Sequence, residues 1–136
     1  MTLGRVLAFD YGTVRIGVAL SDPLRLVASP LTVIDASDPI PEVQRLVEEY
    51  QPDVIVVGLP VHLSGREGES AEAARGFAQE VGTTTGIEVV LIDERFTSTQ
   101  AERALIEGGA KRRVRRKNTD KLAAALILRD YLERMR

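Results

Sequence analysis

Short apolar segments alternate along the chain with polar segments that carry glycine or proline. Tyr11-Gly12-Thr13 alone separates the first two apolar segments, which predicts a hairpin. Pro30 predicts that the third strand lies at an edge of the sheet or contains a bulge. In all, five runs rich in branched residues predict β-strands over Arg5–Asp10, Val14–Leu20, Leu26–Ile34, Asp53–Leu59 and Ile87–Ile92.

Apolar residues at helical spacing predict four helices between and after these strands. The helices cover Asp38 to about Tyr50, Ser70–Val81, Thr97–Glu107 and Asn118–Arg134. Gln51-Pro52 ends the first helix, a turn over Thr83–Gly86 follows the second, and Gly108-Gly109 ends the third. The order βββαβαβαα predicts an α/β fold, a single domain over residues 1–136. Its central five-stranded mixed sheet has helices on both faces, with the first, fourth and fifth strands parallel in the centre.

Composition limits the chemistry that the chain can perform. The chain has no cysteine and one histidine, His62, which excludes thiolate chemistry and leaves little for a catalytic triad or a multi-histidine metal site. Any metal site must rest mainly on carboxylates, which suit Mg²⁺ or Mn²⁺. No apolar run is long enough to cross a bilayer and no signal peptide is visible, so we expect a cytoplasmic protein.

Three acids follow or precede apolar runs, where the fold can bring them together. Asp10 and Glu94 come after predicted strands that run parallel, and Asp120 begins the last helix. A divalent ion held by the three carboxylates can bind phosphate oxygens and activate water. Each acid also has an ordinary interpretation. Asp10 can start a turn, Glu94 or its neighbour Asp93 can pair with Arg95, and Asp120 can cap its helix.

Four motifs, in order along nearly the whole chain, resemble the YqgF/RuvX family. They are Phe9–Ala19 with Ser21-Asp22, Val57–Pro60, Asp93–Ser98, and Asp120–Ala124 leading to Tyr131-Leu132. Members of that family are described as Holliday-junction resolvases and as nucleases that process precursor 16S ribosomal RNA. The resemblance implies a ribonuclease H-like fold and a Mg²⁺- or Mn²⁺-dependent nuclease. It also places the catalytic and metal-binding roles on Asp10, Glu94 and Asp120.

The expected partner is nucleic acid, either precursor ribosomal RNA or branched DNA. The net charge of −2 does not indicate this, but six of the seven residues over 111–117 are basic. We expect this run to form a loop that holds phosphates, without sequence-specific readout. A solvated loop with no such role is the alternative. The predicted substrate contacts are Gly12, Arg15, Arg95, Lys111, Arg112, Arg113, Arg115, Arg116 and Lys117.

Two other functions compete with the nuclease. Asp10-Tyr11-Gly12-Thr13 also resembles the phosphate-binding hairpin of actin-like ATPases and sugar kinases, but those enzymes clamp nucleotide between two such domains. The second rival is a non-catalytic nucleic-acid-binding or ribosome-assembly module. The sequence carries no distinct dimerisation signal, so we expect a monomer or a weak homodimer.

Overall fold

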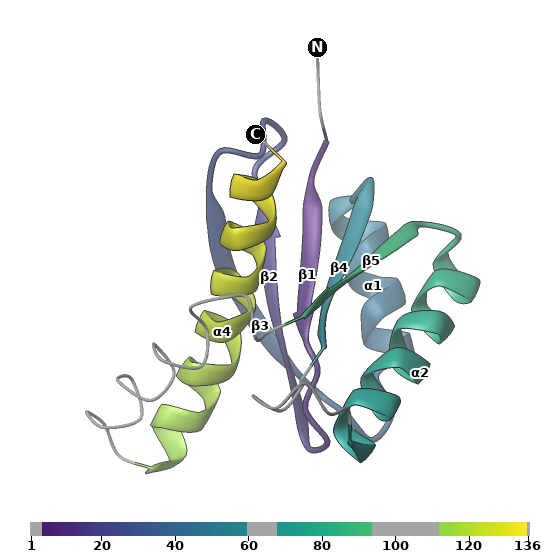
Figure 1. The fold of residues 1–136 in the computed structure, drawn as a ribbon, viewed down its shortest axis with the longest axis vertical. Helices are drawn as coiled ribbons and strands as arrows, with labels where there is room; N and C mark the ends of the chain where they lie inside the picture. Colours follow the sequence, from purple (N-terminus) through teal and green to yellow (C-terminus); the bar gives the residue numbers. More distant parts are fainter. Residues whose placement is uncertain (1–3, 60–67, 94–111, 136) are drawn as a thin grey trace.

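Five strands form one mixed sheet in the order β3-β2-β1-β4-β5 (Figure 1). The computed structural model describes residues 4–59, 68–93 and 112–135. β2 is antiparallel to both of its neighbours, β1 and β3, whereas β4 is parallel to both of its neighbours, β1 and β5. This pairing confirms the predicted hairpin and mixed sheet. The expected central place of the fifth strand is wrong, because β5 lies at the edge. The strands are β1 (Val6–Asp10), β2 (Arg15–Ser21), β3 (Ala28–Asp35), β4 (Val54–Leu59) and β5 (Glu88–Asp93).

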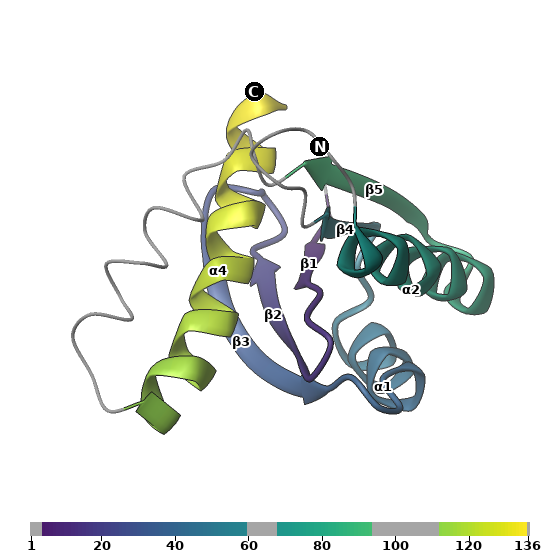
Figure 2. The same ribbon diagram turned by 60° about the horizontal axis from the view of Figure 1, so that its bottom comes forward.

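Helices cover both faces of this sheet. Helix α4 (Arg112–Arg134) crosses β1, β2 and β3 on one face, and α1 (Ile40–Tyr50) and α2 (Glu69–Thr85) lie on the other, as Figure 2 shows. The predicted helix over Thr97–Glu107 lies outside the described residues. Within the described ranges, no helix combines the length and apolarity that crossing a bilayer requires.

The two faces are built from side chains of different size. The core under α1 and α2 contains large side chains from alternate strand positions, such as Leu7, Phe9 and Phe77. The strands contribute smaller side chains to the core under α4, such as Ala8 and Ala19, which alternate with the first set along the strands, whereas α4 itself contributes large ones such as Ile127 and Leu128. The small strand residues let the backbone of α4 approach the sheet at Gly17.

Helix α2 is longer than the sequence predicts. The turn expected over Thr83–Gly86 is wrong, since the helix continues through Thr85 and ends at Gly86, whose φ of 72° is the left-handed C-cap conformation. The Thr85 hydroxyl donates to the carbonyl of Val81 at 2.7 Å, which satisfies a group at the helix end. Gln51 ends α1 in the same left-handed conformation, as expected at that position.

Helix α4 also begins earlier than expected, at Arg112 instead of Asn118. The predicted loop over residues 111–117 is wrong for its residues 112–117, which lie in the first two turns of α4. Arginine and lysine are good helix formers, and neither glycine nor proline interrupts the chain from Arg112 to Arg134. A charged helical segment has no apolar stripe, so hydrophobic periodicity does not detect it.

Pro30 lies in the edge strand β3, opposite Ala19 of β2. The pairing shifts by one residue beside it, between Val18 and Ala19, so that Leu31 is extra in β3. Both interpretations of Pro30, an edge and a bulge, are confirmed.

Candidate active site

Asp10 is the last residue of β1 and one of two buried polar residues in the described core, with only 6% of its surface exposed. Its side chain projects from the same face as Ala8, the face covered by α4. Its neighbours across the sheet are both glycines, Gly17 on β2 and Gly58 on β4. A buried carboxylate is costly unless it is paired or coordinated, so its position at the end of a buried strand points to a specific role.

Gly17 brings α4 against the sheet next to Asp10. A Cβ atom at Gly17 would overlap the backbone carbonyl of Asp120 and touch the amide nitrogen of Lys121. Only glycine permits this approach. Because Asp10 and Gly17 are directly paired, the backbone of Asp120 lies over the strand position next to Asp10, on the α4 face of the sheet.

Asp120 lies well inside α4, eight residues after the helix begins at Arg112. The N-cap interpretation of Asp120 is therefore wrong, since the backbone groups that a cap satisfies belong to the first turn. An acid in the interior of a helix, beside a buried acid on the sheet, requires another explanation than helix capping.

Arg15 makes an ion pair with Asp120, with 2.8 Å between Nε and Oδ2. Arg15 faces α4, because it lies two positions before Gly17 on β2 and strand side chains alternate between the faces. The side chains are 30% and 21% exposed, so water reaches the pair. Such partly exposed pairs contribute about 0–1 kcal/mol to folding, which a ligand can readily outweigh.

Gly12 shapes the turn between β1 and β2, which follows Asp10 directly. A Cβ atom at Gly12 would overlap the backbone carbonyl of Arg15, so the turn closes only with glycine at this position. Gly12 thereby sets the entry of Arg15 into β2. Gly12 thus has a structural role in this turn, and its expected contact with substrate remains a prediction.

Asp93, the last residue of β5, lies on the other face of the sheet from Asp10. Ile92 and Val90 pack in the core under α4, so Asp93 and Leu91 alternate with them toward α2. Of the two adjacent acids in the sequence, Asp93 is thus the one directed away from Asp120. Glu94 lies outside the described residues.

Several other predicted site residues also lie outside the described part of the chain. Arg95, Lys111 and His62 belong to this group. The backbone of the other five basic residues is described as part of α4, but their side chains are not; these are Arg112, Arg113, Arg115, Arg116 and Lys117.

The described donors suit a hard divalent cation. Asp10 and Asp120 offer carboxylate oxygens, which Mg²⁺ and Mn²⁺ prefer. Within residues 4–59, 68–93 and 112–135, no group of three acidic or histidine side chains comes together. The described part of the site therefore supplies two carboxylates and one arginine.

A family model described as "RuvX: Holliday junction resolvase" matches residues 4–134. The chain belongs to the RuvX family. Among similar RuvX relatives, a protein of Lactococcus lactis named "Putative pre-16S rRNA nuclease" is 43% identical over 95% of this chain and 94% of its own length. A Dictyoglomus thermophilum protein of the same name is 42% identical, over 95% of each chain.

Solved structures confirm the ribonuclease H-like fold of this RuvX-family chain. RuvC of T. thermophilus, in complex with Holliday junction substrate, aligns with a TM-score of 0.58 and 17% identity over 96% of each chain. The yeast mitochondrial Holliday junction resolvase Ydc2 aligns with a TM-score of 0.53 and 12% identity, over 100% of this chain and 86% of its own. The chain is thus a nuclease-family protein with the fold of junction resolvases.

Two parts of the site were not anticipated from the sequence. The ion pair between Arg15 and Asp120 joins residues 105 positions apart, and no local pattern signals it. Gly58 attracts attention in the sequence only as part of a family motif, whereas its position beside Asp10 follows from the pairing of β1 with β4. A glycine inside an apolar strand was the available signal.

Proposed function

We propose that this protein is a divalent-metal-dependent nuclease that processes the 5′ end of precursor 16S ribosomal RNA. The observation that carries the proposal is the position of the Asp120 backbone over Gly17, the strand partner of buried Asp10. The names of the relatives supply the substrate, and the family description supplies the alternative, resolution of branched DNA. We place the activity in the cytoplasm, in one domain over residues 1–136, acting as a monomer or a weak homodimer.

Asp10, Asp120 and Glu94 would hold Mg²⁺ or Mn²⁺ in this proposal. The bound ion supplies charge stabilisation at the phosphate and lowers the pKa of water. Asp10 fixes the position of the site because it ends a buried strand, and Asp120 completes the site from α4. Arg15, once Asp120 is engaged by the ion, is in place to contact a phosphate oxygen, which its guanidinium suits.

We assign the third carboxylate to Glu94 in preference to Asp93. Asp93 alternates with Ile92 and therefore faces α2, away from Asp10 and Asp120. The residue of β4 that lies between Asp10 on β1 and Ile92 on β5 is Gly58, which contributes no carboxylate. Glu94, the next residue in the sequence, is therefore the acid that we assign to the site.

The basic segment 111–117 is proposed to bind the phosphate backbone on the approach to Asp120. Residues 112–117 precede Asp120 in the same helix, so they follow one rigid path to the site. Arg95 is assigned a similar role beside Glu94. Removing one basic residue that binds a phosphate would change the salt slope of binding by about 0.9 for a duplex, or about 0.7 for a single strand.

The test is a cleavage assay on a precursor 16S RNA end and on a four-way DNA junction, in Mg²⁺ and in Mn²⁺. We expect native protein to cut the RNA, and Asp10→Asn, Glu94→Gln and Asp120→Asn each to abolish cutting while the protein stays folded. Asp93→Asn is the matched control and should retain activity.

Equal cleavage by the native protein and all three variants would refute the site. Cleavage of the junction alone would replace the substrate but keep the site. Binding of RNA that survives Asp10→Asn, with no cleavage by native protein, would identify a non-catalytic module.

A further inference from the structure

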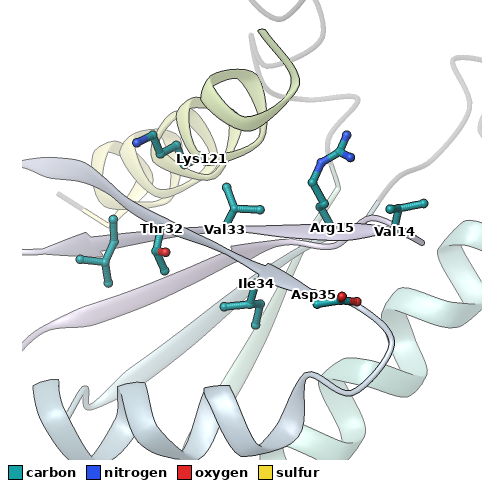
Figure 3. A pocket seen from close by; sticks show the side chains of 8 residues that line it. Val14, Arg15, Thr32, Val33, Ile34, Asp35 and Lys121 are labelled. Carbon is teal, nitrogen blue, oxygen red and sulfur yellow. The ribbon is translucent and has the colours of Figure 1, made fainter. Parts of the chain in front are cut away.

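A pocket of about 520 Å³ opens beside the proposed site, between α4 and the edge strand β3 (Figure 3). Its lining includes Arg15 and Lys121 as cations, Asp35 as an acid, and Val14 and Val33 as apolar side chains. That volume falls in the range that binds one small organic ligand. Figure 3 shows Arg15 and Val33 projecting from the α4 side of the strands, with Lys121 above them on α4 and Ile34 directed to the opposite face.

The pocket is continuous with the proposed site through two of its residues. Lys121 follows Asp120 in α4, and Arg15 is bonded to Asp120 at 2.8 Å. A chain whose scissile phosphate lies at Asp10 and Asp120 would therefore place an adjacent nucleotide in this pocket. Both cations line the pocket, and their charged ends point in different directions in Figure 3.

Three kinds of group line the pocket, and together they match the parts of a nucleotide. Lys121 and Arg15 suit a phosphate. Val14, whose surface is 65% exposed, and Val33 offer an apolar surface for a sugar or base edge. Asp35 offers a carboxylate, and acidic side chains recognise ribose hydroxyls in other nucleotide sites.

Asp35 is held in place as an acceptor. Asp35 on β3 lies opposite Arg15 on β2 in the strand register. Its Oδ1 accepts a hydrogen bond from the backbone N–H of Ser37 at 2.8 Å. That hydrogen bond lowers the pKa of Asp35, so the carboxylate is ionised at neutral pH. An ionised carboxylate accepts a hydrogen bond from the 2′-hydroxyl of RNA, a group that DNA lacks.

We propose that this pocket is a ribonucleotide subsite, in which Lys121 and Arg15 contact backbone phosphates next to the scissile one and Asp35 accepts a hydrogen bond from the ribose 2′-hydroxyl. The inference rests on the proposed nuclease function and adds a structural reason for RNA as substrate. A peptide added to the edge of β3 and a second copy of the chain are the competing occupants.

The first measurement is fluorescence anisotropy with labelled 12-nucleotide single strands of one sequence, as RNA and as DNA, in EDTA. We expect native protein to bind RNA about 5- to 10-fold more tightly than DNA. Lys121→Ala should weaken both by about 3- to 10-fold and lower the salt slope by about 0.7. Arg129→Ala, which removes a charge farther along α4, is the matched control and should change neither.

Asp35→Ala tests the hydroxyl contact by a double-mutant cycle with the 2′-deoxy strand. We expect the variant to bind RNA and DNA equally, whatever its overall affinity, because the cycle isolates the pair. Asp38→Ala, an exposed acid three residues along the chain, should preserve the RNA preference.

Methyl NMR with the trinucleotide UUU locates the ligand directly. The methyl signals of Val14 and Val33 should shift, whereas those of Val27, which is exposed like Val14 but lies in the segment between β2 and β3, should not. Equal shifts at all three valines would overturn the subsite, as would an unchanged affinity of Lys121→Ala or an RNA preference that survives Asp35→Ala. A change of oligomeric state in Lys121→Ala, with oligonucleotide affinity intact, would assign the pocket to a second copy.

The subsite and the nuclease can fail separately, since none of these measurements depends on cleavage. Native cleavage with pocket variants that bind like native protein would refute only the subsite. Pocket-dependent binding without native cleavage would refute only the nuclease.

Discussion

The two faces of the sheet perform different tasks. The face under α1 and α2 is filled with large side chains such as Phe9, Leu46 and Phe77, and ring contacts join Phe9 to Phe77 at 5.5 Å. On the face under α4 the strands carry alanine and glycine near the proposed site, and Asp10, the one buried acid among the described residues, lies between two glycines. Large side chains separate backbones and bury area, whereas small ones let backbones meet.

This difference shows how one small sheet can separate stability from chemistry. The α1/α2 face buries large strand side chains, whereas the strands of the α4 face carry glycine and alanine around the proposed site. Like charges held together cost stability, and active sites commonly carry that cost. Substitutions on the α1/α2 face should therefore lower the free energy of unfolding and leave the cleavage rate unchanged, whereas substitutions at the site on the α4 face should lower the cleavage rate.

Truncation on the α1/α2 face should have the largest effect on stability and none on chemistry. Leu46→Ala removes a side chain that is 2% exposed, and we expect a loss of about 2–5 kcal/mol of unfolding free energy. Urea unfolding measures this loss. The cleavage rate per folded molecule should stay native, and a lower rate at full folding would break the separation between the faces.

Gly17→Ala should affect the cleavage rate more strongly than the stability. Its Cβ would overlap the Asp120 carbonyl, and backbone cannot yield as a side chain can, so we expect a loss of about 1–3 kcal/mol. Displacing Asp120 should lower the cleavage rate by about 100-fold. Gly76→Ala is the matched control, because no atom lies within 4 Å of a Cβ there; it should be stabilising by about 0.5–1 kcal/mol. Native cleavage by Gly17→Ala would contradict the close approach.

Arg15→Gln should affect substrate more than fold. The ion pair with Asp120 is partly exposed, so we expect a change of about 0–1 kcal/mol in unfolding free energy. The KM for RNA should rise, since glutamine carries no charge to hold a phosphate, while the fold is retained. Arg45→Gln, which removes an exposed arginine paired with Glu42 and Glu49, should leave KM native. The same rise in both variants would point to general charge loss instead.

Asp22 shows what an acid with only a structural task does, and its effect should be the smallest. The backbone N–H of Val27 lowers its pKa below the ordinary 3.8, with help from those of Leu26 and Leu24. Because the folded pKa is the lower one, this stabilisation is present above about pH 4 and is lost as pH falls through the folded pKa.

Thermal unfolding at several pH values tests this assignment. Asp22→Ala should lower the Tm slightly at pH 6 and should differ less from native protein near pH 3. Its cleavage should be native at pH 7. A difference in Tm that grows with acid would contradict the assignment.

The strands could be predicted because branched apolar residues recur between glycine and proline, and the pairing of β1 with β2 follows from the short turn at Gly12. The acids at strand ends could be predicted for the same reason. The start of α4 could not, because the basic residues over 112–117 form a helix without an apolar stripe. Asp120 therefore resembles a cap in the sequence, although it lies in the helix interior.

The contact between Asp120 and Gly17 could not be predicted either. It depends on how closely α4 approaches β2, and that distance is set by small side chains on both elements. The edge position of β5 likewise depends on strand order, which local periodicity does not specify. Local sequence patterns thus indicate which residues belong to the site, whereas tertiary packing determines how they are arranged.

Direct Mn²⁺ binding, followed by electron paramagnetic resonance, tests the central claim that Asp10 and Asp120 form one cation site. We predict saturable binding by native protein, strong weakening in Asp10→Asn, Asp120→Asn and Gly17→Ala, and native binding in Asp93→Asn and Gly76→Ala. Binding that is equal in native protein, Asp10→Asn and Gly17→Ala would contradict the account.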